Sequence, residues 1–295
     1  MKRFVKKVLS FSILLIVIVG TLVFTTYYFC RWKFNFEIPK TKNILIVGDS
    51  HPACAINDTI FSSGLNLAQG SIGYFYTYMK VREIANRNSH IDTVVVSYSY
   101  KDLTKEMLFS ERKYIASNMK NHFFLFNLED YVSLFKVNWK EVIINTPKTI
   151  LHSLKMCLIK GYTGIGHYHY SKISEVEAAK HKERVLPTIS SIIYSNNESK
   201  YLLKIYDYCQ KKGITLVLLN APLHPFREAR EAIYKSRYYA FAKEKMPNAS
   251  VINHANFPLT DDCYMDLEHL NGKGGTKYSK FLKENRFRKS ILSSE

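Results

Sequence analysis

The sequence predicts an α/β fold with a doubly wound, mainly parallel sheet of five strands, an N-terminal transmembrane helix and a helical insertion. Short β-branched runs alternate with stretches of helical periodicity, a long uncharged apolar segment lies near the N-terminus, and the alternation stops in the middle of the chain. The chain has 295 residues and 46% hydrophobic content, which suffices for one large core or two smaller domains.

The apolar segment spans residues 8–29, close to the roughly 20 residues that cross a bilayer as a helix. It follows a basic cluster made of Lys2, Arg3, Lys6 and Lys7. Positive charge on this short side predicts a cytoplasmic N-terminus and an extracytoplasmic body. Bulky aromatic residues stand where signal peptidase needs small ones, which favours an uncleaved anchor over residues 1–30 rather than a removed signal peptide. A linker over 31–42 follows.

The α/β domain is expected over residues 43–290. Short apolar runs predict five strands, at 43–47, 64–67, 93–97, 214–219 and 250–253. Apolar residues at helical spacing predict helices between them, at 74–87, 199–212, 229–245 and 275–285. Gly213 is placed to end the second of these helices.

Between about residues 103 and 195 the strand pattern is missing. This stretch is rich in aromatic residues and lysine, and it predicts helices at 128–136 and 148–160, the second beginning after Pro147. We therefore expect a helical insertion between the third and fourth strands. It would serve either as a lid over the carboxyl edge of the sheet or as a subdomain that covers the sheet or contacts a partner.

The formal net charge of +17 is spread along the chain, which favours anionic lipid headgroups or an acidic polymer as partners, or else only a basic solvated surface. No nucleic-acid-binding motif is present, so nucleic acid is not expected as a partner. The five cysteines have no zinc-type spacing, and we expect no metal and no cofactor. In an exported domain two of these cysteines could pair.

Two motifs carry the chemistry. The run Ile44-Leu45-Ile46-Val47 leads into Gly48-Asp49-Ser50-His51, which places the Ser50 hydroxyl at the carboxyl edge of the sheet. Near the C-terminus, Asp266 and His269 lie three residues apart before a helix. Since a serine hydroxyl needs a base and the base needs an orienting carboxylate, we expect Ser50 as nucleophile, His269 as base and Asp266 as orienter. This set predicts an acyl-transferring or ester-cleaving enzyme.

Acyl transfer also needs hydrogen-bond donors for an oxyanion. The backbone N–H groups of Ser50 and of Gly70, which follows the second strand, are the candidates. Neighbouring residues leave alternatives open: Asp261 or Asp262 could replace Asp266 as the orienting carboxylate, and His51 could line the acyl pocket or cap the turn.

Together these residues resemble the SGNH (GDSL-type) hydrolase superfamily, over roughly residues 43–100 and 200–290. The resemblance rests on Gly48-Asp49-Ser50 after the first strand, Gly70 after the second, and Asp266-x-x-His269 before the last helix. It implies a flavodoxin-like sheet and a serine-dependent mechanism that uses Ser50, His269 and Asp266.

The chain departs from the hydrolytic branch of that superfamily. The G-x-N-D motif, whose Asn gives a third oxyanion donor, is replaced by Ser97-Tyr98-Ser99-Tyr100, so a serine of this stretch or Asn220 is the candidate substitute. Leu270-Asn271 follows the histidine in place of the proline common in hydrolases.

With the anchor, these departures make the chain more similar to the membrane-anchored branch, which includes the D-alanyl transfer protein of teichoic acid modification and alginate O-acetyltransferase-like proteins. That resemblance implies extracytoplasmic acyl transfer to or from a cell-envelope polysaccharide, with a membrane-bound O-acyltransferase as a partner that donates the acyl group. A carbohydrate esterase or lipase-type hydrolase of the same fold is the alternative.

Two further classes compete. Asp49-x-His51 and Gly166-His167-Tyr168-His169 are similar to ligand motifs of metallophosphoesterases, but the additional G-D-x-x-D and G-N-H-[DE] motifs are missing, and Asn121-His122 lacks the glycine and the acid. The absent G-x-N-D motif also leaves open an inactive envelope protein that keeps the fold.

Overall fold

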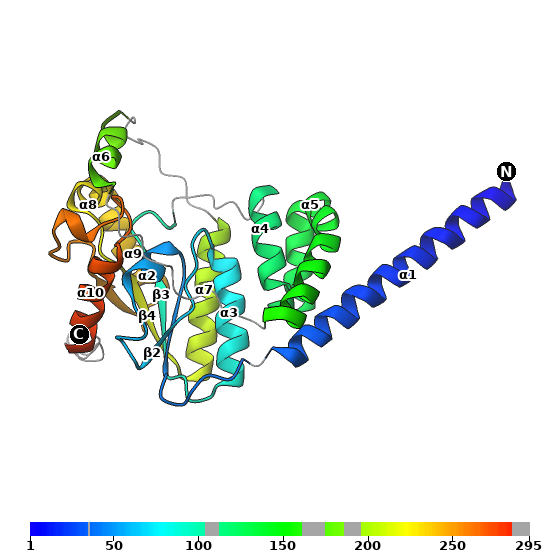
Figure 1. The fold of residues 1–295 in the computed structure, drawn as a ribbon, viewed down its shortest axis with the longest axis horizontal. Helices are drawn as coiled ribbons and strands as arrows, with labels where there is room; N and C mark the ends of the chain where they lie inside the picture. Colours follow the sequence, from blue (N-terminus) through cyan, green and yellow to red (C-terminus); the bar gives the residue numbers. More distant parts are fainter. Residues whose placement is uncertain (35, 104–111, 161–174, 186–195, 285–295) are drawn as a thin grey trace. The chain divides into compact units, whose positions relative to one another are not determined.

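The computed structural model describes residues 1–34, 36–103, 112–160, 175–185 and 196–284 (Figure 1). Its centre is a five-stranded sheet in which every neighbouring pair of strands is parallel, in the order β2-β1-β3-β4-β5. The strands are β1 (Ile44–Val47), β2 (Gly64–Asn66), β3 (Thr93–Ser97), β4 (Thr215–Asn220) and β5 (Ser250–Asn253). The expected five-stranded parallel sheet is confirmed, with strand ends within a residue of the predicted ones.

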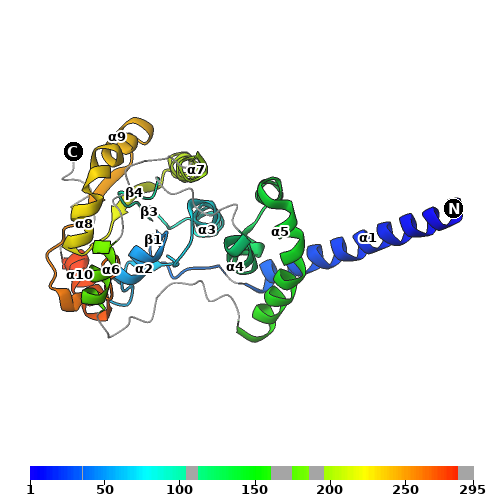
Figure 2. The ribbon, with the colours of Figure 1, turned by 90° about the horizontal axis from the view of Figure 1, so that it is seen from above.

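Helices cover both faces of this sheet (Figure 2). They are α2 (Ser50–Ala55), α3 (Tyr74–Arg87), α7 (Asn196–Lys212), α8 (Pro225–Glu231), α9 (Lys235–Lys245) and α10 (Gly272–Glu284). On one face, Ile46, Val95 and Val217 of the strands form a core with Ala55 of α2 and Tyr278 of α10. Helices α3 and α7 pack together on the other face.

Several helix boundaries differ from the expected ones. The single helix expected at 229–245 is divided into α8, a 3-10 turn and α9. Helix α8 begins four residues before the expected start, because Pro225 is favourable at the first position of a helix. Gly213 does end α7, with φ of +67° and its N–H donated to the carbonyl of Gln210.

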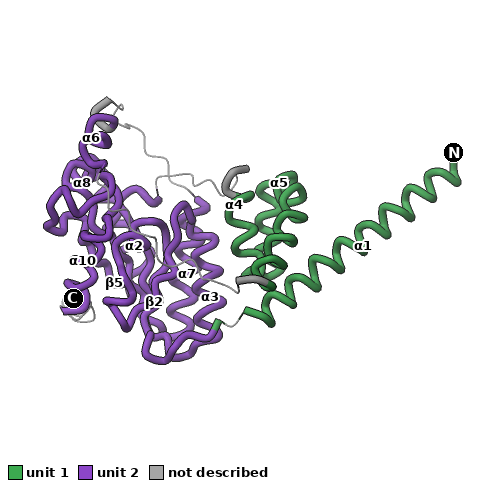
Figure 3. The backbone as a smooth tube through the Cα atoms, viewed as in Figure 1, with its two compact units in different colours: residues 1–36, 109–163 green, residues 37–108, 164–295 purple. Residues whose placement is uncertain are grey.

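The chain forms two compact units (Figure 3). One contains the sheet and comprises residues 37–108 and 164–295. The other comprises residues 1–36 and 109–163 and consists of α1 (Lys2–Lys33), α4 (Arg112–His122) and α5 (Leu128–Lys155), with a 3-10 turn at Phe123–Leu125 and a π-helical turn at Met156–Lys160. We call these the sheet unit and the anchor unit.

Helix α1 is long and apolar enough to cross a membrane, with a mean hydropathy of 2.7 in its most apolar window. It continues to Lys33, so it extends three residues into the expected linker. Its last turns pack within the anchor unit: the Tyr27 hydroxyl donates to the carbonyl of Phe126 (2.6 Å), and Cys30 Sγ lies 2.6 Å from Cys157 Sγ.

The insertion is mainly helical where it is described. The helix expected at 128–136 is the first part of α5, which begins at Leu128, whereas no separate helix begins after Pro147. Helix α5 runs through Pro147, kinks at Asn138 instead, and carries a capping box at Asn127 and Asp130. Buried residues on both sides of Pro147 share one face of α5, so packing holds the helix together although proline removes a backbone hydrogen bond. Helix α6 (Val176–Val185) belongs to the sheet unit. Residues 104–111, 161–174 and 186–195 lie outside the described part.

The turn after β1 is possible only with glycine. Gly48 has φ of +121°, and a Cβ atom there would lie 2.4 Å from the Cβ of Ser97 in β3. A side chain would therefore be strained by the backbone conformation and would also collide with the neighbouring strand. Glycine at this position lets the chain turn directly from β1 into α2.

We expect Gly48→Ala to lower the free energy of unfolding by about 3 kcal/mol, because it adds a steric clash to an unfavourable backbone conformation. Gly213→Ala is the matched control. Its φ is also positive, but nothing lies within 4 Å of the added carbon, so a loss of only about 1–2 kcal/mol is expected. Denaturant unfolding of both variants in detergent, followed by circular dichroism, measures the difference. Equal losses would show that contact with Ser97 is unimportant.

Candidate active site

The structure brings Ser50, His269 and Asp266 into one hydrogen-bonded chain. Ser50 is the first residue of α2, directly after the turn at Gly48, and its Oγ lies 2.7 Å from Nε2 of His269. Nδ1 of His269 lies 2.9 Å from Oδ2 of Asp266. With Nδ1–H donated to the carboxylate, Nε2 is free to accept the Ser50 proton. The three residues expected to act together thus lie in contact although 219 positions separate Ser50 from His269.

The loop that carries Asp266 and His269 is held by the same carboxylate. Oδ1 of Asp266 accepts hydrogen bonds from the backbone N–H of Glu268 (2.7 Å) and of His269 (2.8 Å). Burial raises the pKa of Asp266, but the hydrogen bond and charge of His269 outweigh burial, so the net pKa is lowered. Asp266 therefore stays ionised near neutral pH and fixes the orientation of the imidazole.

The two alternative orienting carboxylates are engaged elsewhere. Asp261 pairs with Lys180 (2.7 Å) and His224 (3.1 Å), and Asp262 pairs with Lys273. Within the described residues only Asp266 contacts the ring of His269 through a carboxylate, which resolves the alternative in favour of Asp266.

A second Asp–His pair flanks Ser50. Oδ2 of Asp49 lies 2.9 Å from Nδ1 of His51, and Oδ1 of Asp49 accepts hydrogen bonds from the His51 N–H (3.0 Å) and the Ser97 hydroxyl (2.7 Å). The imidazole rings of His51 and His269 stack, with centroids 5.5 Å apart. It is Asp49 that caps α2, whereas the His51 ring reaches into the site.

Burial alone would lower the pKa of His51, but the Asp49 carboxylate and its hydrogen bond raise that pKa to about 9. His51 is therefore an imidazolium near neutral pH and has two N–H donors. Its Nε2 is buried, and no described residue accepts a hydrogen bond from it. In the sequence, an Asp and a His two residues apart indicated metal ligands. The hydrogen bond between them was not predicted.

Glu268, between Asp266 and His269, belongs to a ring of four charged residues. Its Oε1 lies 2.6 Å from Nζ of Lys101 and 2.6 Å from Nη2 of Arg227, and both cations also contact Glu231, at 3.1 and 2.7 Å. Burial would raise the pKa of Glu268, but Lys101 and Arg227 outweigh it and lower that pKa to about 2. The ring fixes the loop next to His269.

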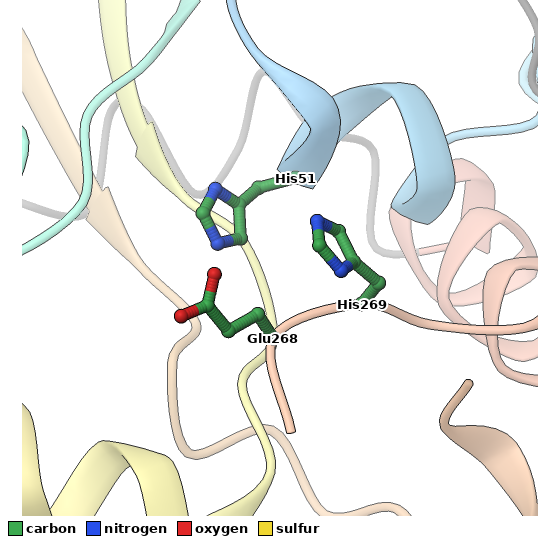
Figure 4. A group of neighbouring side chains, drawn as sticks. All are labelled: His51, Glu268 and His269. Atoms are coloured by element: carbon green, nitrogen blue, oxygen red, sulfur yellow. The ribbon is translucent and has the colours of Figure 1, made fainter. Parts of the chain in front are cut away.

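His51, Glu268 and His269 are the described residues whose side chains come close enough to share a metal ion (Figure 4). Their potential ligand atoms lie within 4.8 Å of one another. A divalent cation there would face the charges of Lys101, Arg227 and protonated His51, and ligation by Nε2 of His269 would break its hydrogen bond to Ser50. The charges present therefore fit a hydrogen-bonded site better than a metal site.

The sequence also offered two other stretches similar to metallophosphoesterase motifs, and the structure describes one of them. Asn121 and His122 lie in α4 of the anchor unit, where Nδ1 of His122 contacts the carbonyl of Asn118 (2.8 Å). The stretch 166–169 lies outside the described residues.

The loop after β2 is attached to the turn that presents Ser50. The Gln69 N–H donates to the carbonyl of Gly48 (2.8 Å), which places Gly70 beside this turn. Buried Lys80 donates to the carbonyl of Leu67 (2.9 Å) and to Oε1 of Gln69 (3.2 Å). Burial lowers the pKa of Lys80 to about 7. As the first residue of a helix, Ser50 has no intrahelical acceptor for its N–H, which keeps that group available to a ligand.

The candidates for a third oxyanion donor are placed less favourably. The hydroxyl of Ser97 donates to Asp49, and that of Ser99 donates to Asp102 (2.6 Å). Asn220 is the last residue of β4, and no described residue makes a hydrogen bond with its buried side-chain amide. Its neighbour Leu219 points to the face of the sheet that α2 covers, so strand alternation directs Asn220 to the opposite face.

We expect His51 to make folding stability depend on pH. Its pKa is raised from 6.5 to about 9, so protonated His51 contributes its full stabilisation below about pH 6.5 and loses it as the pH rises through about 9. The difference in free energy of unfolding between the wild type and His51→Gln should therefore shrink from about pH 7 to about pH 10.

Urea unfolding in detergent across this range measures that difference. His181→Gln, at an exposed position of α6, is the control and should show no such trend. A difference between wild type and His51→Gln that stays constant with pH would contradict the assignment of His51 as an imidazolium.

Comparison of the chain with protein-family models, curated proteins and solved structures gives no match in any of the three.

Proposed function

We propose that this chain is an extracytoplasmic, membrane-anchored enzyme that transfers an acyl group through an acyl-Ser50 intermediate. The observation that carries the proposal is the chain of hydrogen bonds from Ser50 through His269 to Asp266, with distances of 2.7 and 2.9 Å. It would join a nucleophile, a base and an orienting carboxylate at the carboxyl edge of a parallel sheet, beside β1 and β3. In a sheet of this order the strand order reverses between these two strands, and ligands bind at such a point.

The proposed reaction has two halves. Ser50 Oγ attacks the carbonyl carbon of the acyl donor while its proton moves to Nε2 of His269, and Asp266 stabilises the resulting imidazolium. His269 then protonates the leaving group, and the acyl group remains on Ser50. In the second half, an acceptor hydroxyl gives its proton to His269 and attacks the acyl-serine, and His269 returns that proton to Ser50 Oγ as the acyl group leaves. Water in place of the hydroxyl would make the same site an esterase.

The developing oxyanion needs positive groups beside Ser50. The backbone N–H groups of Ser50 and of Gly70 are two candidate donors, and His51 offers a charged N–H donor in place of the neutral side-chain amide that the missing G-x-N-D motif would supply. This role of His51 is supported by its position next to Ser50, by the stacking of its ring on that of His269, and by its unused Nε2–H. An imidazolium in a buried site interacts strongly with developing negative charge.

The acceptor is proposed to be a hydroxyl of a cell-envelope polysaccharide, with a membrane-bound O-acyltransferase as the partner that supplies the acyl group. This part rests on the resemblance of the Gly48-Asp49-Ser50 and Asp266-x-x-His269 motifs to the anchored branch of the SGNH superfamily. The apolar helix α1 and the cationic N-terminal residues support an anchor whose N-terminus is cytoplasmic. The acyl content of envelope glycans in cells with and without the protein distinguishes transferase from esterase.

Release of nitrophenol from p-nitrophenyl acetate tests the serine mechanism in the full chain in detergent. We expect Ser50→Ala to lower the rate by about a thousandfold or more, because the nucleophile is lost. Ser62→Ala changes an exposed serine and should keep the wild-type rate. Equal rates in the wild type and Ser50→Ala would refute the mechanism, and chelator-sensitive phosphatase activity would favour the metal-dependent alternative.

A second series tests His51. We expect His51→Gln to lower the rate of acyl release by about a hundredfold, as for the loss of an oxyanion donor, while His181→Gln leaves it unchanged. The wild-type rate should also fall as the pH rises above about 9, where His51 loses its charge. A fall of the same size in His51→Gln would show that another group titrates.

A further inference from the structure

Helix α5 has an unusual distribution of side chains in its second half, after the kink at Asn138. Its exposed side chains include Trp139, Ile143, Ile144 and Leu151, which are 51–69% exposed, and Leu158 in the following π-helical turn is 74% exposed. Positions 139, 143, 147 and 151 follow each other at intervals of four and therefore lie on one face of a helix. We call Trp139, Ile143, Ile144, Leu151 and Leu158 the α5 apolar face.

The inward side of the same segment is comparatively polar. Asn145, Thr146, Thr149 and Ser153 are buried together with Val142 and Ile150. The Asn145 amide and the Thr146 hydroxyl satisfy their donors on backbone carbonyls of their own helix, at 2.8 and 2.7 Å. A helix in water normally buries its large apolar residues and exposes its polar ones. Here four of these six buried residues are polar while large apolar side chains are exposed, which indicates that the α5 apolar face meets an apolar surrounding.

The position of α5 within the anchor unit suggests that this apolar surrounding is a membrane. Cys30 at the end of the apolar stretch of α1 contacts Ser153 of α5, with Sγ 3.6 Å from the Ser153 carbonyl. Arg31 donates to the carbonyl of Phe124 (3.2 Å), just before α5. Figures 1 and 3 show α5 beside the C-terminal end of α1. A spanning α1 would have its C-terminal end at the membrane interface, and α5 would lie there with it.

The charges on α5 agree with a lipid partner. Beside and beyond the kink the helix exposes four lysines, Lys136, Lys140, Lys148 and Lys155. It also carries one glutamate there, the half-buried Glu141. A second copy of this face would place these lysines against one another, whereas anionic lipid headgroups would attract them. Lysines bordering an apolar face with a tryptophan are typical of helices that lie in the plane of a membrane interface.

We propose that the α5 apolar face docks on the bilayer that α1 crosses, with its large side chains at the boundary between headgroups and acyl chains. The anchor unit would then be attached to the membrane by a spanning helix and by a helix lying on the surface. This inference concerns the anchor unit alone and is independent of the proposed chemistry at Ser50.

Tryptophan fluorescence tests the proposal, because the chain has only two tryptophans, Trp32 and Trp139. Trp32→Phe leaves Trp139 as the single reporter on the α5 apolar face. The full-length variant is reconstituted into vesicles of phosphatidylcholine and phosphatidylglycerol, with and without bromine on the acyl chains. We expect brominated lipid to lower Trp139 emission about twofold or more, and aqueous iodide to quench it weakly, as for a side chain below the headgroups.

The control moves the reporter to the sheet unit. In Trp32→Phe, Trp139→Phe, Ile233→Trp, the tryptophan replaces an exposed isoleucine after α8, and we expect iodide to quench it and brominated lipid to leave it unaffected. Strong iodide quenching of Trp139 without quenching by brominated lipid would overturn the proposal. Protection of Trp139 from both quenchers would also overturn it, because a second copy of the chain or the sheet unit would then cover the α5 apolar face.

Discussion

The carboxylate of Asp49 joins the parts on which the candidate site depends. It accepts hydrogen bonds from the hydroxyl of Ser97 at the end of β3 and from the backbone and ring of His51 in α2, and it follows the glycine that turns the chain after β1. Two central strands and the first turn of α2 are thus connected through one side chain. Burial raises the pKa of Asp49, but His51 and Ser97 outweigh it and hold the net pKa well below its usual range, so the connection persists through neutral pH.

This connection explains why Ser50 has little conformational freedom. Gly48 fixes the turn before Ser50, Asp49 caps the helix that Ser50 begins, and His269 accepts a hydrogen bond from the Ser50 hydroxyl. On the opposite side, Lys101 and Arg227 hold Glu268. The loop that carries His269 is thus fixed by residues other than Ser50 and Asp266. Ser50 and His269 are therefore positioned by two networks, which meet at the hydrogen bond between them and at the stacking of His51 on His269.

Much of the fold could be predicted from local sequence, because buried parallel strands are short apolar runs and Gly213 marks a helix end. The course of α5 through Pro147 could not, since distant packing holds that helix together. Ser50, Asp266 and His269 were found because each belongs to a short local motif, although Ser50 lies 219 positions from His269, and their role in catalysis remains a prediction. The His51–Asp49 pairing was missed because D-x-H also indicates metal ligands. Lys101, with a partner 167 positions away, had no signal in the sequence.

The charge around Ser50 differs from the charge of the whole chain. The protein carries a formal net charge of +17, yet the charged groups at the site nearly cancel: His51, Lys101 and Arg227 stand against Asp49, Asp266, Glu231 and Glu268. Long-range attraction of an anionic polymer would therefore come from the outer surface, whereas Ser50 and His269 sit in a locally balanced field. Raising the ionic strength would therefore weaken the binding of such a polymer well before it changed the rate of the proposed reaction at Ser50.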